Sequence, residues 1–216
     1  MLNSSSQSPA DPASVRTGRK PSTSRGQLEQ HALRLFADRG FDEVTVEDIA
    51  SAAGIGRRTF FRYYRSKNDV VWGDFDGELQ RMRELLAAYP RRTPMMDALR
   101  ETIVEFNRID AAQLPWHRLR MSLILEIPAL QAHSTLRYAS WRAVVAEFAA
   151  HRLGQPHDAL LPQLVAHVCL GASVAAYQQW LRQDERGDQG AADLCAFLDE
   201  AHRAIGPGLQ AYEPRT

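Results

Sequence analysis

We predict an all-α fold of two helical parts from three features of the sequence. Apolar residues recur every three or four positions through most of the 216 residues, as they do on one face of a helix. Glycine and proline separate these stretches, and no segment alternates apolar and polar residues as a half-buried strand does. Hydrophobic residues make up 44% of the chain, which is enough to bury a core.

The N-terminal third is the more basic part of the chain. Residues 1–70 contain 11 Arg and Lys against 8 Asp and Glu, whereas residues 71–216 contain 15 against 18. This excess favours the N-terminal part as the place where a polyanion binds. Residues 1–22 are small, polar and basic, and we expect a disordered arm there. Such an arm either adds solubility or touches phosphates or the minor groove of DNA.

Residues 23–68 are expected to form the first domain, and two helices open it. The first begins near Ser24 and ends at Gly40, where Phe41 packs back on its last turn. The second begins at Thr45, which forms a capping box with Asp48. The apolar face of the first helix consists of Leu28, Ala32, Leu35 and Phe36.

A helix-turn-helix is expected at the end of this domain. The second helix stops at Gly54, and after a tight turn a short helix runs from Arg57 to about Tyr64. Phe60 and Tyr64 stand four residues apart and should face the core, which leaves the polar and basic groups exposed. Such groups suit the major groove, because arginine makes bidentate contacts to guanine. The expected DNA contacts are Thr45, Arg57, Arg58, Thr59, Phe61, Arg62, Tyr63 and Lys67.

The stretch from Leu28 to Val71, which contains LRLFADRGFDEVTVEDIASAAGIGRRTFFRYYRSKNDV, resembles the N-terminal domain of the TetR family of regulators. The resemblance implies three N-terminal helices, the third of which reads DNA, and a C-terminal domain for ligand binding and dimerisation. It also implies the DNA contacts named above, except Arg58. Two positions depart from the pattern and put the base preference in doubt. Gly56 stands where many members have serine, and Arg58 where many have a small residue. The segment GRRTFFRYYRSKNDVVWGDFD is similar to the actinobacterial subgroup that accompanies mycofactocin biosynthesis clusters.

Residues 69–216 are expected to form a helical ligand-binding and dimerisation domain. Capping residues, prolines and glycines bound each apolar stretch. The small residues of the 159–182 helix would let a second copy of the chain approach closely, with the last helix completing a four-helix interface. A dimer would place two recognition helices about one DNA turn apart, which predicts a palindromic operator. The expected helices are 66–88, 93–110, 114–127, 130–152, 159–182 and 191–205.

The aromatic residues of the second domain are either core packing or the wall of a cavity between helices. The cluster at residues 116–120 places a tryptophan beside arginines that could pair with a carboxylate, a phosphate or an acyl-CoA head group. The alternative is a solvated helix start. His167 lies on an apolar helix and is expected as a core histidine. The candidate ligand-binding residues are Trp116, Arg118, Arg120, Met121, Tyr138, Trp141 and Tyr177.

Several classes of function are disfavoured by the sequence. Cys169 and Cys195 are two isolated cysteines without a CxxC pair, so no metal site and no cofactor are expected. We find no P-loop, dinucleotide fingerprint or HExxH motif, and GASVA at Gly171 lacks the preceding strand of a nucleophile elbow, so an enzyme is not expected. The N-terminus lacks a signal peptide and no run of about 18 apolar residues is apparent, which predicts a cytoplasmic protein.

The resulting prediction is a dimeric repressor that a small apolar or acyl-CoA-like molecule releases from DNA. Repression itself is implied by the family resemblance alone. The alternative is an architectural DNA-binding protein that responds to no ligand. Residues 71–216 argue against this alternative, because dimerisation alone does not need a domain of that length.

Overall fold

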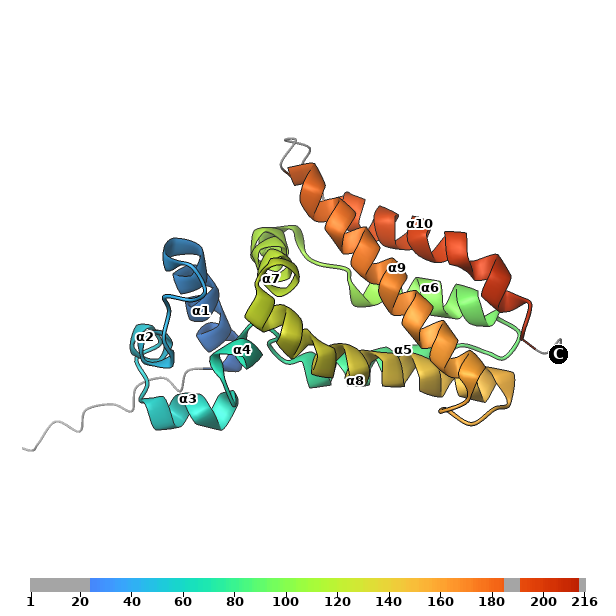
Figure 1. Ribbon diagram of the computed structural model, residues 1–216, viewed down its shortest axis with the longest axis horizontal. Coiled ribbons are helices and arrows are strands. Elements are labelled where there is room, and N and C mark those ends of the chain that lie inside the picture. Colours follow the sequence, from blue (N-terminus) through green and yellow to red (C-terminus); the bar gives the residue numbers. More distant parts are fainter. Residues whose placement is uncertain (1–23, 185–190, 214–216) are drawn as a thin grey trace, which may run out of the picture.

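The computed structural model describes residues 24–184 and 191–213, so the predicted arm of residues 1–22 lies outside the described part. The described residues form helices and no strand, which confirms the predicted all-α class. Figure 1 shows a small group of helices, α1–α4, at one end of an elongated molecule and the longer helices α5–α10 over the rest.

The small group consists of α1 (Arg25–Arg39), α2 (Val46–Ala52), α3 (Arg57–Tyr63) and α4 (Lys67–Val70). Complete capping boxes begin α1 at Ser24 and α2 at Thr45, as the sequence predicted for Thr45. Phe41 packs back on Phe36, with 5.0 Å between ring centroids. The buried face of α1 consists of Leu28, Ala32, Leu33 and Phe36, so Leu33 takes the place expected for Leu35.

The prediction of a single helix over residues 66–88 is wrong. The chain breaks after α4, and α5 (Phe75–Ala87) begins a separate helix. Gly73 lies in the break with a φ of +57°, a left-handed conformation that glycine adopts without strain. Val71 and Trp72, just before it, are buried. The turn at Gly73 therefore lets the chain change direction while these two side chains stay in the core.

The larger domain adds α6 (Met95–Phe106), a short 3-10 turn (Ala111–Gln113), α7 (Leu114–Glu126), α8 (Pro128–Leu153), α9 (Leu160–Asp184) and α10 (Ala191–Gln210). Two ends of these helices differ from prediction by more than two residues. α6 stops four residues early, where the Asn107 side chain donates to the Ile103 carbonyl oxygen at 2.8 Å. α10 continues through Pro207 instead of ending before it. Side chains beyond Pro207 fix this end to the start of α6, because Gln210 and Glu213 accept from the amides of Met96 and Met95.

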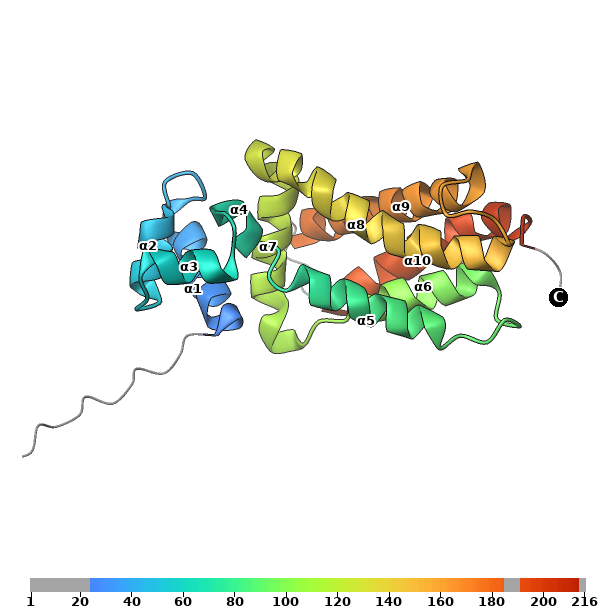
Figure 2. The same ribbon diagram turned by 90° about the horizontal axis from the view of Figure 1, so that it is seen from below.

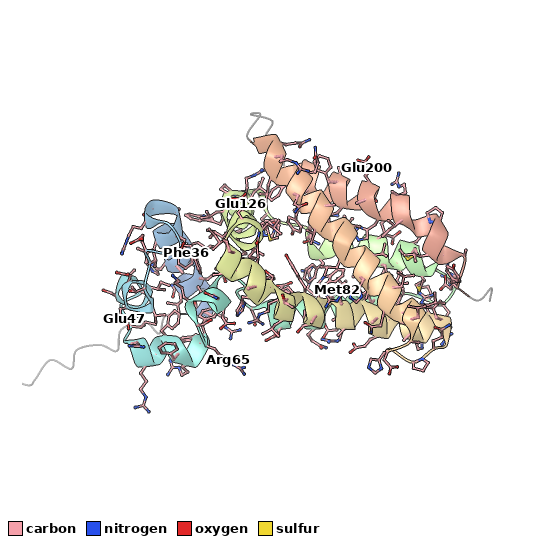
Figure 3. All side chains as sticks on the ribbon, in the orientation of Figure 1. Phe36, Glu47, Arg65, Met82, Glu126 and Glu200 are labelled. Carbon is pink, nitrogen blue, oxygen red and sulfur yellow. The ribbon has the colours of Figure 1, made fainter. Side chains whose placement is uncertain are left out.

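The described residues form two apolar cores, and one of these cores contains residues of both domains. The larger core lies among α5, α6, α8, α9 and α10. The smaller core lies among α1–α4 but is completed by Leu123 and Ile124 of α7 and Leu130 of α8. Figure 2 shows α7 running across the molecule between the two groups, and Figure 3 places Phe36 in one group and Met82 in the other. The domain boundary between residues 68 and 69 stays a prediction. Helix α7 packs against the helices on both sides of this boundary.

Two expectations about α9 change with the structure. Over Leu160–Gln183 this helix is long and apolar enough to span a membrane by composition, although the sequence showed no uninterrupted apolar run. Part of it is buried, and it packs along α8 and α10 as a core helix does. His167 is exposed rather than buried, with Nδ1 2.8 Å from the Gln163 carbonyl oxygen. The fully buried histidine is His202 on α10.

Candidate DNA interface and ligand cavity

Helix α3 is held by two aromatic rings and presents guanidinium groups on its other side. Phe60 is fully buried and Tyr64 is 4% exposed, as their spacing predicted. Phe61 is 42% exposed, and its ring packs edge-on against Phe60 with centroids 5.4 Å apart. Arg57, Arg58 and Arg62 are exposed, whereas Thr59 and Tyr63 are half-buried.

The three exposed arginines are only weakly engaged by the protein itself. Arg57 forms an exposed ion pair with Glu47 of α2 at 2.9 Å, and Arg62 lies over the Tyr63 ring at 5.2 Å. Arg58 pairs with no carboxylate in the described part of the chain. Exposed ion pairs contribute little free energy, so their arginines exchange partners easily. The face of α3 is thus a set of cations available to an anionic partner.

Two predicted contact residues are already engaged elsewhere. The Thr45 hydroxyl accepts from the Asp48 amide at 3.1 Å and donates to Asp48 Oδ2 at 2.6 Å, which lowers the pKa of Asp48 to about 2. Lys67 Nζ donates to the Phe41 carbonyl oxygen at 2.7 Å and lies 4.3 Å from the Phe41 ring centre. Burial lowers the pKa of this ammonium group. A second, longer hydrogen bond of 3.4 Å reaches the Asp42 carbonyl oxygen. Lys67 therefore links α4 to the segment after α1, and one of its three donors is left for a phosphate.

A cavity of about 280 Å³ lies in the larger domain, enclosed by α5, α6, α7, α8 and α9. Its wall is largely apolar and aromatic, including Phe75, Ile124 and Leu170. Trp72 contributes from the α4–α5 break, where its ring contacts Phe75 and Tyr138. Of the seven residues proposed from the sequence, five line this cavity, namely Arg120, Met121, Tyr138, Trp141 and Tyr177.

The other two candidates do not line the cavity. Trp116 packs against the smaller core, with the Arg34 guanidinium 5.7 Å from its ring centre. Arg118 stacks at 4.0 Å on Trp180 and donates to the Trp180 carbonyl oxygen at 3.0 Å. The reason is the helical register of α7, in which positions 117, 120, 121 and 124 share the cavity side and positions 116, 119 and 123 share the side toward α1.

A row of neutral polar groups crosses one side of the cavity. The Tyr177 hydroxyl donates to Asn107 Oδ1 at 2.5 Å, and His117 Nε2 lies 3.0 Å from the same hydroxyl. Burial lowers the pKa of His117 to about 4 and raises that of Tyr177, so both groups are uncharged at neutral pH. Since the hydroxyl donates to Asn107, His117 Nε2 carries the hydrogen of its bond to Tyr177. No sequence pattern pointed to Asn107, because this residue falls inside a helix that was expected to continue to residue 110.

A helix-turn-helix with free cations, joined to a helical domain with an apolar cavity, defines a DNA-binding regulator that senses a small molecule. Residues 30–71 match the family described as bacterial regulatory proteins, tetR family, and residues 93–210 match the MftR C-terminal domain. The chain belongs to the TetR family and carries an MftR-type C-terminal domain. It is therefore a transcriptional regulator rather than an enzyme, as the sequence predicted.

Known proteins with similar sequence or structure agree with this family. The mycofactocin biosynthesis transcriptional regulator MftR of Mycobacterium tuberculosis is 42% identical over 198 residues, covering 92% of this chain and 97% of that protein. The fatty acid degradation regulator FadR of Bacillus halodurans has the same fold, with a TM-score of 0.63 at 18% identity over 88% of this chain and 98% of that one. FadR of Thermus thermophilus gives 0.54 at 21% identity, over 84% and 93%.

Proposed function

We propose that this protein is a cytoplasmic repressor that binds a palindromic operator as a homodimer and is released by a small apolar or acyl-CoA-like molecule. The observation that carries the DNA part is the arrangement of α3, in which Phe60 and the following Tyr64 are buried while the arginines face outward. Regulators of the TetR family bind DNA and typically act as dimers with small-molecule effectors. The proposed DNA contacts remain Thr45, Arg57, Arg58, Thr59, Phe61, Arg62, Tyr63 and Lys67.

The cavity supports the effector part of the proposal. Its largely apolar wall suits a hydrocarbon chain, and polar groups in the wall, among them Arg120 and the His117–Tyr177 pair, can orient a ligand. The Thermus thermophilus FadR structure is a complex with lauroyl-CoA. Its fold is shared with this chain, and on that likeness we choose lauroyl-CoA as the first probe. The proposed ligand-contacting residues are Arg120, Met121, Tyr138, Trp141 and Tyr177.

The regulated genes are proposed from the Mycobacterium tuberculosis relative. The Mycobacterium tuberculosis protein is named for mycofactocin biosynthesis and matches this chain almost from end to end. We assign the same class of target genes to this chain. Genome-wide binding-site sequencing with the purified protein tests the assignment, and sites confined to unrelated genes would contradict it.

The exposed side of α9 supports the homodimer. Leu160 is 80% exposed and Leu164 40%, and the exposed Gly171 and Ala175 continue the same side of the helix. Small residues at this spacing let a second helix approach closely. Leu164→Arg should shift the protein to a monomer in sedimentation velocity. Leu136→Arg is the matched control, since Leu136 is 70% exposed on α8 and should leave the dimer intact.

One experiment tests repressor and effector together. Binding sites are selected from random duplex DNA with the purified protein, and the selected duplex is then titrated in the presence of lauroyl-CoA. We expect an inverted repeat among the selected sequences and release of the protein from it by lauroyl-CoA, but not by coenzyme A alone. Selection of unrelated sequences would contradict a specific operator, and binding that no acyl-CoA alters would remove this effector class.

The architectural alternative makes a different prediction for the isolated protein. A protein that responds to no ligand should show no rise in melting temperature in a thermal-shift screen with metabolites. The apolar cavity argues for the sensor, because a ligand that binds there would stabilise the folded state by mass action.

A further inference from the structure

One ion pair connects the cavity wall directly to the DNA-binding domain. Arg120 lies on α7 and lines the cavity, and its guanidinium pairs with the carboxylate of Glu29 on α1. Both side chains are largely removed from solvent, with 25% and 16% of their surfaces exposed. An ion pair in such surroundings is screened less by water and salt than a surface pair.

Glu29 also contacts the break between α4 and α5. A Cβ atom at Gly73 would lie 2.5 Å from Glu29 Oε2, so the carboxylate occupies space that only a glycine leaves open. The residue before Gly73 is Trp72, which lines the cavity. Glu29 therefore lies against two segments, α7 and the break between α4 and α5. In α7 the contacting residue Arg120 itself lines the cavity, and in the break the residue next to Gly73 does.

Arg120 also has one hydrogen-bond donor that no described protein group uses, and this donor is closed off from the cavity as well as from solvent until the side chain moves. Its Nε is buried and has no hydrogen-bond partner among the described residues. Burial also lowers the pKa of the guanidinium, which shows how strongly this group lacks solvent. An acceptor oxygen on a ligand would satisfy the free donor, because an unpaired buried N–H is costly.

The other ion pairs between the two domains lack this link to the cavity. Arg25 pairs with Asp74 at 2.6 Å on the surface, and Asp69 of α4 pairs with Arg137 of α8 at 2.8 Å. None of these four residues lines the cavity. In the described part of the chain, the ion pair between Arg120 and Glu29 is thus the one inter-domain pair that includes a residue of the cavity wall.

We infer that a ligand bound in the cavity changes the position of the DNA-binding domain through Arg120. An oxygen of the ligand, such as the carbonyl of an acyl thioester or a carboxylate, binds Arg120 and draws it away from Glu29. The carboxylate is then left buried without its partner, so α1 loses its fixed position against α7. The inference rests on the proposed function, because it names how the same cavity would release DNA.

A double-mutant cycle on operator affinity tests the pair without any ligand. The variants are Glu29→Gln, Arg120→Gln and the double variant, each measured on the duplex selected from random DNA. We expect each single variant to lose about five-fold in affinity and the double variant to lose no more than either, since coupled contacts are not additive. Glu147→Gln is the control, because Glu147 pairs with Arg83 at 3.1 Å within the larger domain.

The ligand arm uses lauroyl-CoA on the same variants. Glu29→Gln should bind lauroyl-CoA at least as tightly as the unchanged protein does, because the ligand no longer has to break the ion pair. The ratio of operator affinity without and with the ligand should fall toward one. Arg120→Lys keeps a charge for Glu29 but lacks the Nε donor, so it should keep operator affinity and respond less to the ligand. This variant also guards against a folding defect in Arg120→Gln.

The outcomes separate this inference from the proposed function. Single variants within two-fold of the unchanged protein, or a Glu29→Gln variant with the full response to lauroyl-CoA, would overturn the role of the pair. If the unchanged protein does not respond to lauroyl-CoA, the proposed effector class is wrong, and the ligand-free cycle still decides whether the pair holds the DNA-binding state.

Discussion

The face of α3 and the wall of the cavity are the two candidate binding sites, and they are built in opposite ways. The face comes from one seven-residue helix, and its arginines stay in water. The cavity wall comes from five helices, and its ionisable groups lose so much solvent that the pKa of His117 falls to about 4. One short segment thus specifies the face, whereas the cavity depends on how distant segments pack. Four predictions test this contrast, starting with the largest expected effect.

Phe60→Ala should show that α3 depends on its buried ring. Phe60 is fully buried, and removing such a ring costs about 3–5 kcal/mol of unfolding free energy. Phe61→Ala is the matched control one residue away, where the ring is 42% exposed. Its loss should be about 1 kcal/mol or less, while operator affinity falls. Urea unfolding measures both, and equal losses would contradict the orientation of α3.

Acid should destabilise the cavity through His117. The pKa of this group is about 4 in the folded protein against an ordinary 6.5, so the unfolded chain takes up the proton first as the pH falls. The stability is therefore complete above pH 6.5 and is lost between pH 6.5 and about 4, by no more than about 3 kcal/mol.

The corresponding measurement compares urea unfolding near neutral and mildly acid pH. His117→Gln should lose less stability on acidification than the unchanged protein. It should keep part of the loss, because burial also lowers the pKa of His202. His167→Gln controls for the removal of a histidine that is exposed. If His117→Gln loses as much unfolding free energy on acidification as the unchanged protein does, the imidazole of His117 is not buried.

Arg58→Ala should reduce specific binding more than nonspecific binding. A bidentate contact to guanine is worth about 1–3 kcal/mol, so operator affinity should fall about ten-fold or more. Lys67→Gln is the comparison, since a phosphate contact should weaken binding to all duplexes alike and flatten the salt dependence. Gel-shift titrations on operator and random duplexes measure both. Equal effects of Arg58→Ala on the two duplexes would remove base reading by this residue.

The smallest effect concerns the start of α3. Gly56 occupies the N-cap without a side-chain hydrogen bond, with φ of −82°, and an added Cβ would meet nothing within 4 Å. Gly56→Ser should raise the unfolding free energy by a few tenths of a kcal/mol, because serine accepts a free amide of the first turn. Gly54→Ser is the control, since Gly54 has a φ of +66° and should lose about 1 kcal/mol. A loss in both variants would contradict the cap.

The sequence sufficed where the information is local. The capping box at Thr45 follows from a spacing of three residues, and the burial of the Phe60 and Tyr64 side chains follows from a spacing of four. The structure agrees with both. The break after α4 was missed, because a glycine inside an apolar stretch reads equally well as a helix interior. The end of α10 was also missed, because contacts with the distant start of α6 hold the helix beyond Pro207.

The α7 helix shows most clearly what only the tertiary structure decided. Its sequence has apolar and polar residues on all sides, so no spacing distinguishes the side of Trp116 from the side of Arg120. Packing turned Trp116 toward α1 and Arg120 toward the cavity, because α7 lies between two cores and must serve both. The sequence alone therefore determined most of the helices and the face of α3, which depend on neighbours a few residues away. The cavity and its link to Glu29 depend on contacts between residues far apart in the chain, and only the folded structure brings these together.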